Sequence, residues 1–184
     1  MTNYIVAKDY LCFMALVEMI VSETNPCNNF TQTDFAESFG ITVPIGEDIP
    51  IKNVQYSNNI KDWGTNVSVK ELNAFFHKYN IPLVVSYIPS NFFNELNFND
   101  LVLAKSRNSF VVFAFCYGIL YNEIQNYDVG HVVLFENLDE KNDLVSVYDP
   151  GPRNVGSKVV RVDDIIYAMK RRGGIFLFEK IDRS

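Results

Sequence analysis

The chain contains few cysteines, few histidines and few basic residues, and each shortage excludes a class of function. Its 3 cysteines are an odd number without a C-x-x-C spacing, so we expect neither a disulfide framework nor a zinc site, and a reducing compartment is favoured. The 16 basic residues are outnumbered by 22 acidic ones. We therefore expect no nucleic-acid partner, because phosphate binding needs a basic surface. The 2 histidines lie far apart in the chain and form no ligand cluster, so we expect no metal site and no cofactor.

The chain also lacks a long hydrophobic run. Its most apolar stretch, LCFMALVEMIV, includes Glu18 and has about eleven residues, whereas a membrane span needs roughly 20. No basic segment precedes it and no cleavage site for a signal peptidase follows it. We interpret the stretch as a buried helix. We expect no membrane partner and a cytoplasmic location, and export by a route without a cleaved signal stays open.

The chain has enough apolar and aromatic side chains for a hydrophobic core. Hydrophobic residues make up 48% and aromatic residues 14% of the sequence, and the length fits one domain, over residues 1–184. Helical patterns come first and strand patterns later, which is typical of an α+β fold with N-terminal helices packed on a mostly antiparallel sheet. The predicted helices cover residues 10–20, 32–39, 69–80 and part of 159–173, and the predicted strands cover 82–88, 109–122, 131–137, 144–149 and 174–180.

Capping residues and irregular segments divide these elements. Asp9 is the predicted N-cap of the first helix, and Asp163 or Asp164 that of the last helix. Residues 41–65 and 90–108 are rich in Asn and turn formers and are predicted to be loops, the second with a possible helical turn. Because long loops in compact domains are often functional, we expect both of them to line a substrate groove.

Cys12 is the candidate nucleophile. With Asp9 as N-cap, Cys12 would be the third residue of the helix, where unpaired N–H groups and the helix dipole favour a thiolate. Lys8 is near in sequence, and an imidazolium from elsewhere in the fold would be a more effective partner. The alternative is a small core residue, which is the usual role of a free cysteine on an apolar helix.

His131 is the candidate general base. It follows Gly130, which permits close backbone approach, and it begins an apolar strand. Its pKa near neutrality suits proton transfer, although a histidine at a strand end can also simply bind a backbone carbonyl. His77 lies beside the apparently exposed Lys78 and aromatic residues, and we assign it a structural role.

Asp149 is the candidate residue that orients the imidazole. The acidic turn between residues 131–137 and 144–149 predicts a β-hairpin, which would bring the two strand ends near each other. A carboxylate there would fix the tautomer that accepts a proton from the thiol. The alternative is a turn residue, since Asp-Pro-Gly-Pro favours a turn by itself.

In their order along the chain, these segments resemble the papain-like bacteriocin-processing peptidases, which cut after a double glycine. CFMALVEMI resembles the nucleophile helix of that family, and GHVVLFENLDEKNDLVSVYDPG resembles its histidine and aspartate strands. TQTDFAESFGITVP, GTNVSVKELNAFFHKYNIPL and DDIIYAMKRRGGIFLFEK resemble the second helix, the following helical segment, and the closing helix and strand. The resemblance implies a papain-like fold with Cys12, His131 and Asp149 as catalytic residues.

The sequence departs from this family on the side of the oxyanion hole. Members usually carry a glutamine several residues before the cysteine, and residues 1–11 contain none. Asn3 and Tyr10 are the candidate replacements. Phe13 follows Cys12 where the family usually has glycine, so the acyl-binding region would be crowded. Losing one oxyanion donor typically costs about 100- to 1,000-fold in turnover, which implies a weaker, different or absent activity.

Two functions therefore remain open at this level. The first is a cysteine hydrolase of papain-like mechanism acting on a peptide or amide bond, with acyl transfer to an amine as a variant that uses the same residues. The second is a degenerate domain that binds a peptide or protein partner without cleavage. Gly173 and Gly174 match the sequence that such peptidases cut, but a helix end before a core strand explains them better. The oligomeric state stays open.

Overall fold

A computed structural model describes residues 4–94, 96–123 and 128–181 of the chain. The helices in these ranges are α1 (Cys12–Thr24), α2 (Gln32–Phe39), α3 (Val69–Lys78), α4 (Phe98–Ser106), α5 (Tyr117–Leu120) and α6 (Val162–Arg171), with short 3-10 helices η1 (Ile60–Asp62) and η2 (Ser90–Phe92). The strands are β1 (Ile41–Val43), β2 (Val54–Tyr56), β3 (Leu83–Pro89), β4 (Ser109–Cys116), β5 (Gly130–Asp139), β6 (Leu144–Asp149), β7 (Gly156–Arg161) and β8 (Gly174–Lys180).

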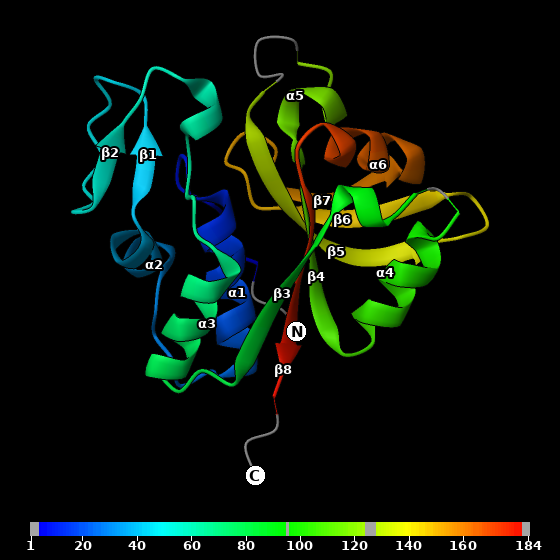
Figure 1. The fold of residues 1–184 in the computed structure, drawn as a ribbon, viewed down its shortest axis with the longest axis horizontal. Coiled ribbons are helices and arrows are strands. Elements are labelled where there is room, and N and C mark those ends of the chain that lie inside the picture. The colour runs from blue at the N-terminus through cyan, green and yellow to red at the C-terminus, as the bar shows by residue number, and fades with distance from the viewer. Residues whose placement is uncertain (1–3, 95, 124–127, 182–184) are drawn as a thin grey trace.

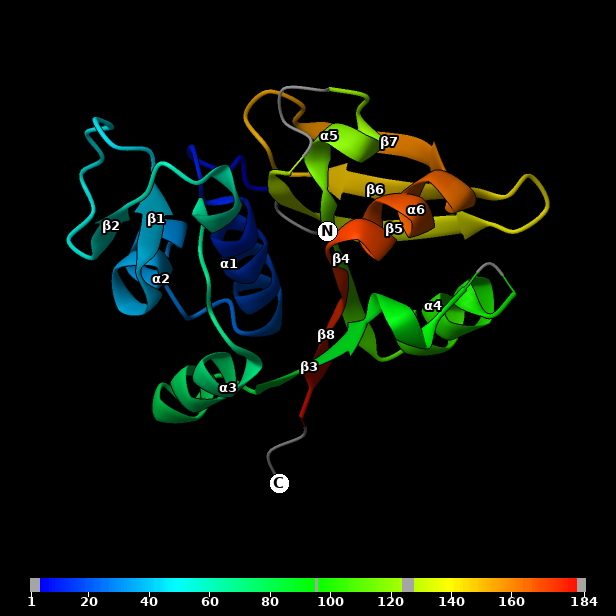
Figure 2. The same cartoon turned by 45° about the horizontal axis from the view of Figure 1, so that its top comes forward.

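The predicted α+β class is confirmed. Within the described ranges, six α-helices accompany a six-stranded antiparallel sheet of order β3-β8-β4-β5-β6-β7 and a small parallel pair, β1 with β2. Helices α1, α2 and α3 and the small pair gather on one side of the molecule, and the large sheet with α4, α5 and α6 lies on the other (Figure 1). The same division is seen when the molecule is turned (Figure 2).

Along the central strands, alternate side chains pack into two different hydrophobic cores. In β5, for example, Leu134 belongs to the core under α1–α3, while its neighbour Val133 belongs to the core under α4 and α6. Phe178 and Leu177 divide in the same way in β8. Because neighbouring side chains of a strand point to opposite faces, the sheet separates the two cores. Burying each such side chain contributes roughly 1.5–3 kcal/mol.

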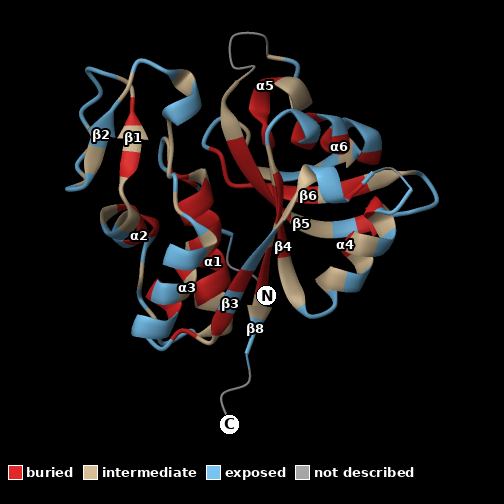
Figure 3. Cartoon of the chain, in the orientation of Figure 1, coloured by how far each residue is buried: buried red, intermediate tan, exposed pale blue. Residues whose placement is uncertain are grey.

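The first helix is buried along nearly its whole length, as its apolar sequence predicted (Figure 3). Its predicted start is wrong: Leu11, not Asp9, is the N-cap, and Cys12 is the first helical residue. The reason is a turn in which the N–H of Leu11 donates to the carbonyl of Lys8 at 3.0 Å, with Tyr10 at a φ of 65°. This turn keeps Asp9 outside the helix.

Other helix starts divide between confirmed and corrected predictions. Ser68 caps α3 through a capping box with Glu71, as predicted. The last helix has Arg161 as N-cap without a side-chain bond. Asp163 and Asp164 lie in its first turn instead, because β7 runs directly into α6.

The two predicted loops contain regular structure. Residues 41–65 hold β1, β2 and η1, and residues 90–108 hold η2 and α4. The predicted strand at 109–122 ends at Cys116, where α5 begins. Strands as short as β1 are stabilised by pairing with a distant partner, so the local sequence carries little signal for them.

Gly173 and Gly174 have the structural role that the sequence favoured. A Cβ on Gly173 would lie 1.9 Å from the carbonyl oxygen of Ala114, and one on Gly174 would lie 2.3 Å from that of Ile88. The pair therefore lets β8 enter between β3 and β4. Among the helices of the described residues, none combines the length and the apolar character that crossing a membrane requires.

Candidate active site

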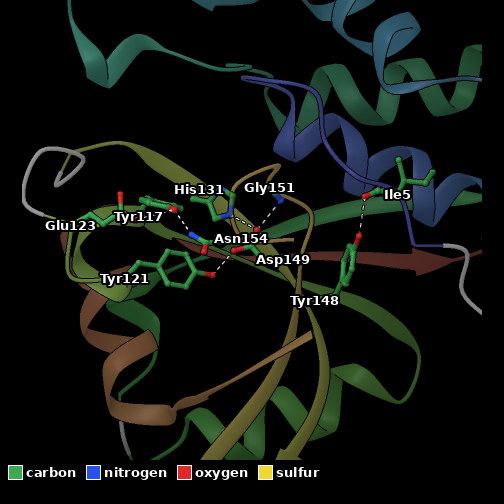
Figure 4. A network of polar contacts seen from close by, with 9 residues as sticks. All are labelled: Ile5, Tyr117, Tyr121, Glu123, His131, Tyr148, Asp149, Gly151 and Asn154. Carbon is green, nitrogen blue, oxygen red and sulfur yellow. Dashed lines mark hydrogen bonds and ion pairs between the residues drawn. The ribbon is translucent and has the colours of Figure 1, made fainter. Parts of the chain in front are cut away.

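The three side chains predicted to act together lie next to one another. Cys12 begins α1, His131 is the second residue of β5, and Asp149 ends β6. Nε2 of His131 lies 2.8 Å from Oδ1 of Asp149 (Figure 4), and Cys12 lies close enough to the same imidazole to raise its pKa. Since Nε2 is engaged by the carboxylate, Nδ1 is the ring nitrogen that remains for proton transfer.

The register of the hairpin explains why the histidine and the aspartate meet. Leu134 pairs with Tyr148, so extending the ladder by one pair sets Val133 opposite Asp149. His131 lies two residues before Val133 and therefore on the same face of the sheet, diagonal to Asp149. Side chains on such a diagonal are within reach of each other when one is long or aromatic.

The carboxylate of Asp149 is fully buried and bound on both of its oxygens. Oδ1 accepts the N–H of Gly151 at 2.7 Å as well as His131, and Oδ2 accepts the hydroxyl of Tyr121 (Figure 4). Burial alone would raise the pKa of this carboxyl. The bond to His131 and its charge, followed by the bonds from Tyr121 and Gly151, bring the pKa below its usual value.

The imidazole of His131 is buried as well, with 8% of its surface exposed. Burial lowers its pKa, but the hydrogen bond to Asp149, together with the nearby Cys12 and the negative charges of both groups, outweighs burial and raises the pKa to about 9. His131 is therefore an imidazolium at neutral pH. A cation beside a cysteine at a helix N-terminus is the environment in which reactive thiolates occur.

Three aromatic rings hold the imidazole in place. The rings of Phe115, Tyr117 and Tyr121 stand edge-on to it at centroid distances of 5.7, 5.2 and 6.3 Å. The hydroxyl of Tyr117 accepts the amide of Asn154 (Figure 4). These contacts restrict rotation of the ring.

A segment formed by residues 4–8, here called the N-terminal strap, sets the position of Cys12. The N–H of Ala7 donates to the carbonyl of Pro150 at 2.7 Å, directly beyond Asp149. The side-chain amide of the buried Gln32 in α2 binds the strap through both of its polar atoms. Its oxygen accepts the N–H of Lys8 at 2.7 Å, and its nitrogen donates to the carbonyl of Val6 at 3.1 Å. The strap thus ties the start of α1 to the end of the hairpin.

Two cavities open beside the candidate residues, of about 270 Å³ and about 290 Å³. Cys12, His131, Gly130, Trp63 and Gly64 line both of them, so an extended ligand could cross the site. The walls of the first cavity are mainly apolar, and include Phe13, Val67, Tyr87, Ala114, Phe115, Val132 and Phe176. The second cavity carries charges of both signs, on Lys8, Asp9, Glu47 and Arg153.

The two oxyanion candidates have different outcomes. Asn3 lies outside the described residues. Tyr10 lines the second cavity together with Cys12, but its hydroxyl donates to Glu47 at 3.3 Å. Leu11 provides no side-chain cap, and the first N–H groups of a helix have no partner within it. The N–H of Cys12 is therefore a donor that the fold itself supplies.

Phe13 forms a wall of the first cavity. Its ring packs 4.9 Å from the ring of Phe176, and only 8% of its surface is exposed.

The two segments that were expected to line a substrate groove have different outcomes. Residues 41–65 contribute Glu47, Trp63 and Gly64 to the cavities, whereas residues 90–108 line neither cavity. That second expectation is wrong because α4 packs into the core with α6, away from both cavities.

The remaining cysteines and the second histidine lie elsewhere. Cys27 is exposed and Cys116 is buried, and His77 is exposed in the last turn of α3.

The sequence did not point to three residues that contribute to the site: Tyr121, Gly151 and Gln32. The turn Asp-Pro-Gly-Pro signals a glycine near the carboxylate, but nothing local identifies the other two, because each acts over more than twenty residues of chain.

No group of three or more His, Cys, Asp or Glu side chains within the described ranges could hold a metal ion. In comparisons with known proteins, no family model matches the chain, and no curated protein is detectably similar to it in sequence.

Proposed function

We propose that the protein is a cysteine hydrolase of papain-like mechanism acting on a peptide or amide bond. The observation that carries the proposal is the grouping of Cys12, His131 and the buried Asp149, in which His131 bonds to Asp149 and lines the same two cavities as Cys12. A purely structural cysteine would need no imidazolium beside it. A purely structural histidine would need no buried carboxylate on its far nitrogen.

The residues supply each step of amide hydrolysis. The Cys12 thiolate attacks the carbonyl carbon to form a C–S bond, and the oxyanion accepts the N–H of Cys12. His131 then gives its proton to the leaving nitrogen as the C–N bond breaks, which leaves a thioester. Water attacks the thioester while His131 takes its proton, and the C–S bond breaks to release the acid. An amine in place of water would give acyl transfer.

The order of the segments along the chain supports a papain-like fold related to the bacteriocin-processing peptidases, and we propose this family on that basis. Two cavities beside one thiol suit a peptide or protein substrate that extends on both sides of the cleaved bond. Three free cysteines fit a reducing compartment such as the cytoplasm.

The second candidate is a domain that binds such a peptide without cutting it. The observation that favours it is the hydroxyl of Tyr10, which is directed to Glu47 rather than held ready for an oxyanion. A library of fluorogenic peptides separates the two functions. A hydrolase releases fluorophore only while Cys12 is intact, whereas a binding domain shows peptide-dependent stabilisation in both the wild type and Cys12→Ala and releases nothing.

Alkylation tests the thiol directly and needs no substrate. At pH 6, iodoacetamide should modify Cys12 roughly 100-fold faster than the exposed Cys27, because an ordinary thiol is almost fully protonated at that pH. The buried Cys116 is the control for access. Replacing His131 with alanine should abolish the advantage of Cys12. Equal, slow modification of Cys12 and Cys27 would contradict the nucleophile assignment.

A further inference from the structure

We propose that Tyr121 is a positioning residue that holds the Asp149 carboxylate, and through it His131, in the orientation that the reaction needs. This inference rests on the proposed function. Tyr121 directly follows α5 and lies 28 residues before Asp149 in sequence, so no catalytic motif points to it.

The geometry assigns separate donors to the two carboxylate oxygens. Oδ1 takes the N–H of Gly151 and the imidazole of His131, and Oδ2 takes the hydroxyl of Tyr121 (Figure 4). Rotation of the carboxylate would break bonds on both oxygens at once. Tyr121 therefore fixes the plane in which Asp149 meets Nε2 of His131.

Among the described residues, the groups around Asp149 offer no second donor to replace the hydroxyl of Tyr121. Asp149 has no exposed surface, so water cannot replace a lost donor without rearrangement. The other titratable groups that act on the carboxylate are His131, Tyr117 and Tyr148. The hydroxyl of Tyr117 bonds with Asn154 and Glu123, and that of Tyr148 donates to the carbonyl of Ile5 at 3.2 Å. In the described part of the chain, Oδ2 therefore depends on Tyr121.

Tyr121 also stays a donor at every accessible pH. Burial, together with the charge of Asp149 and the bond to it, raises the pKa of this phenol far above its usual value. The hydroxyl thus stabilises the ionised carboxylate without titrating itself. Removing it makes Asp149 harder to ionise, so the carboxylate that supports the imidazolium is lost at a higher pH.

The test is the pH profile of Cys12 alkylation in Tyr121→Phe, which keeps the ring and removes the hydroxyl. We expect the fall in alkylation rate at low pH, here called the acidic limb, to occur about one pH unit higher in the variant than in the wild type. A shift of this size is expected from losing a hydrogen bond to a charged group. Tyr167→Phe is the matched control, because it deletes the hydroxyl of an exposed tyrosine on α6 and leaves both the carboxylate and the N-terminal strap unchanged. Its profile should coincide with that of the wild type.

A double-mutant cycle shows whether Tyr121 acts through Asp149. In an Asp149→Asn background the side chain cannot ionise, so adding Tyr121→Phe should no longer move the acidic limb. NMR of ¹⁵N-labelled histidine gives a second readout, which is simple because the chain has 2 histidines. Titration of His131 should change between the wild type and Tyr121→Phe, and that of His77 should not. All rates are compared below the onset of thermal unfolding of each variant.

The outcomes separate this inference from the proposed function. If Cys12 of the wild type has no advantage over Cys27, the proposed function fails and the inference fails with it. If the advantage is present and needs His131, but the profile of Tyr121→Phe equals that of the wild type, the positioning role is overturned alone. An equal shift in the Asp149→Asn background would likewise show that Tyr121 does not act through the carboxylate.

Discussion

Nε2 of His131 lies 2.8 Å from Oδ1 of Asp149, and both side chains are withdrawn from solvent. Two groups that would each be costly to bury as isolated charges are buried together. Because the pKa of His131 is raised to about 9 and that of Asp149 is lowered, their protonation is coupled to folding.

The first prediction concerns stability and pH. Below pH 6.5 the imidazole is protonated in the folded and unfolded states, and the interaction contributes fully. Between pH 6.5 and about 9 only the folded state keeps the proton, so rising pH removes a contribution on the order of 3 kcal/mol. In acid, the contribution of Asp149 is present above about pH 4 and lost as pH falls through its lowered pKa. Urea unfolding across pH 3–10 measures both limbs.

His131→Gln is the control for this pH dependence. Other titrating groups contribute equally to the wild type and to the variant, so the difference between their free energies of unfolding isolates the pair. That difference should be largest between about pH 4 and 6.5 and should shrink above it. A difference that stays constant from pH 6 to 9 would show that the pKa of His131 is not raised by folding.

The second prediction concerns Gly151. A Cβ at this position would lie 3.0 Å from Oδ1 of Asp149 and 3.1 Å from Cε1 of His131. Gly151→Ala should therefore displace the pair, lower the free energy of unfolding by about 1–3 kcal/mol and slow alkylation of Cys12 at pH 6. Gly46→Ala is the matched control: its φ of 96° disfavours alanine, but the Cβ meets nothing within 4 Å. It should lower stability and leave the alkylation rate unchanged; equal loss of rate in both variants would refute the steric explanation.

The third prediction concerns the N-terminal strap. Gln32→Ala removes two hydrogen bonds to the backbone of Val6 and Lys8, which should cost about 1–3 kcal/mol of stability. Because the strap leads directly to Cys12, the variant should also lose part of the fast alkylation. Gln55→Ala, at an exposed position of β2, is the control and should change neither quantity by a measurable amount. Full alkylation speed in Gln32→Ala would mean that α1 alone positions the thiol.

Local patterns predicted the helices and strands that have strong local signals. The capping box from Ser68 to Glu71 gave the start of α3, and the acidic turn gave the β5–β6 hairpin. The prediction failed where the chain depends on distant partners. Asp9 has the right chemistry for an N-cap, but the turn from Lys8 to Leu11 moves the helix start two residues onward.

The residues of the candidate site also fall into two groups, those with a local sequence signal and those that depend on distant partners. Cys12, His131 and Asp149 could be named from the sequence because each one has a local signal, namely the beginning of an apolar helix, a glycine before a strand, and a strand end before a turn, and because a family resemblance pointed to the same three residues. Tyr121 and Gln32 have none, since a tyrosine after a short helix and a glutamine in a second helix are ordinary surface candidates. Their importance comes from contacts with residues that are distant along the chain.

The sequence by itself determined the α+β class and the chemistry that is available, because hydrophobic periodicity and the scarcity of histidine and cysteine are local or countable properties. Only the tertiary structure decided that the thiol meets the imidazole, that both oxygens of Asp149 are bound, and that cavities flank the pair. The physical reason is that burial and hydrogen bonding between distant segments set protonation and orientation, and neither can be computed from neighbours along the chain.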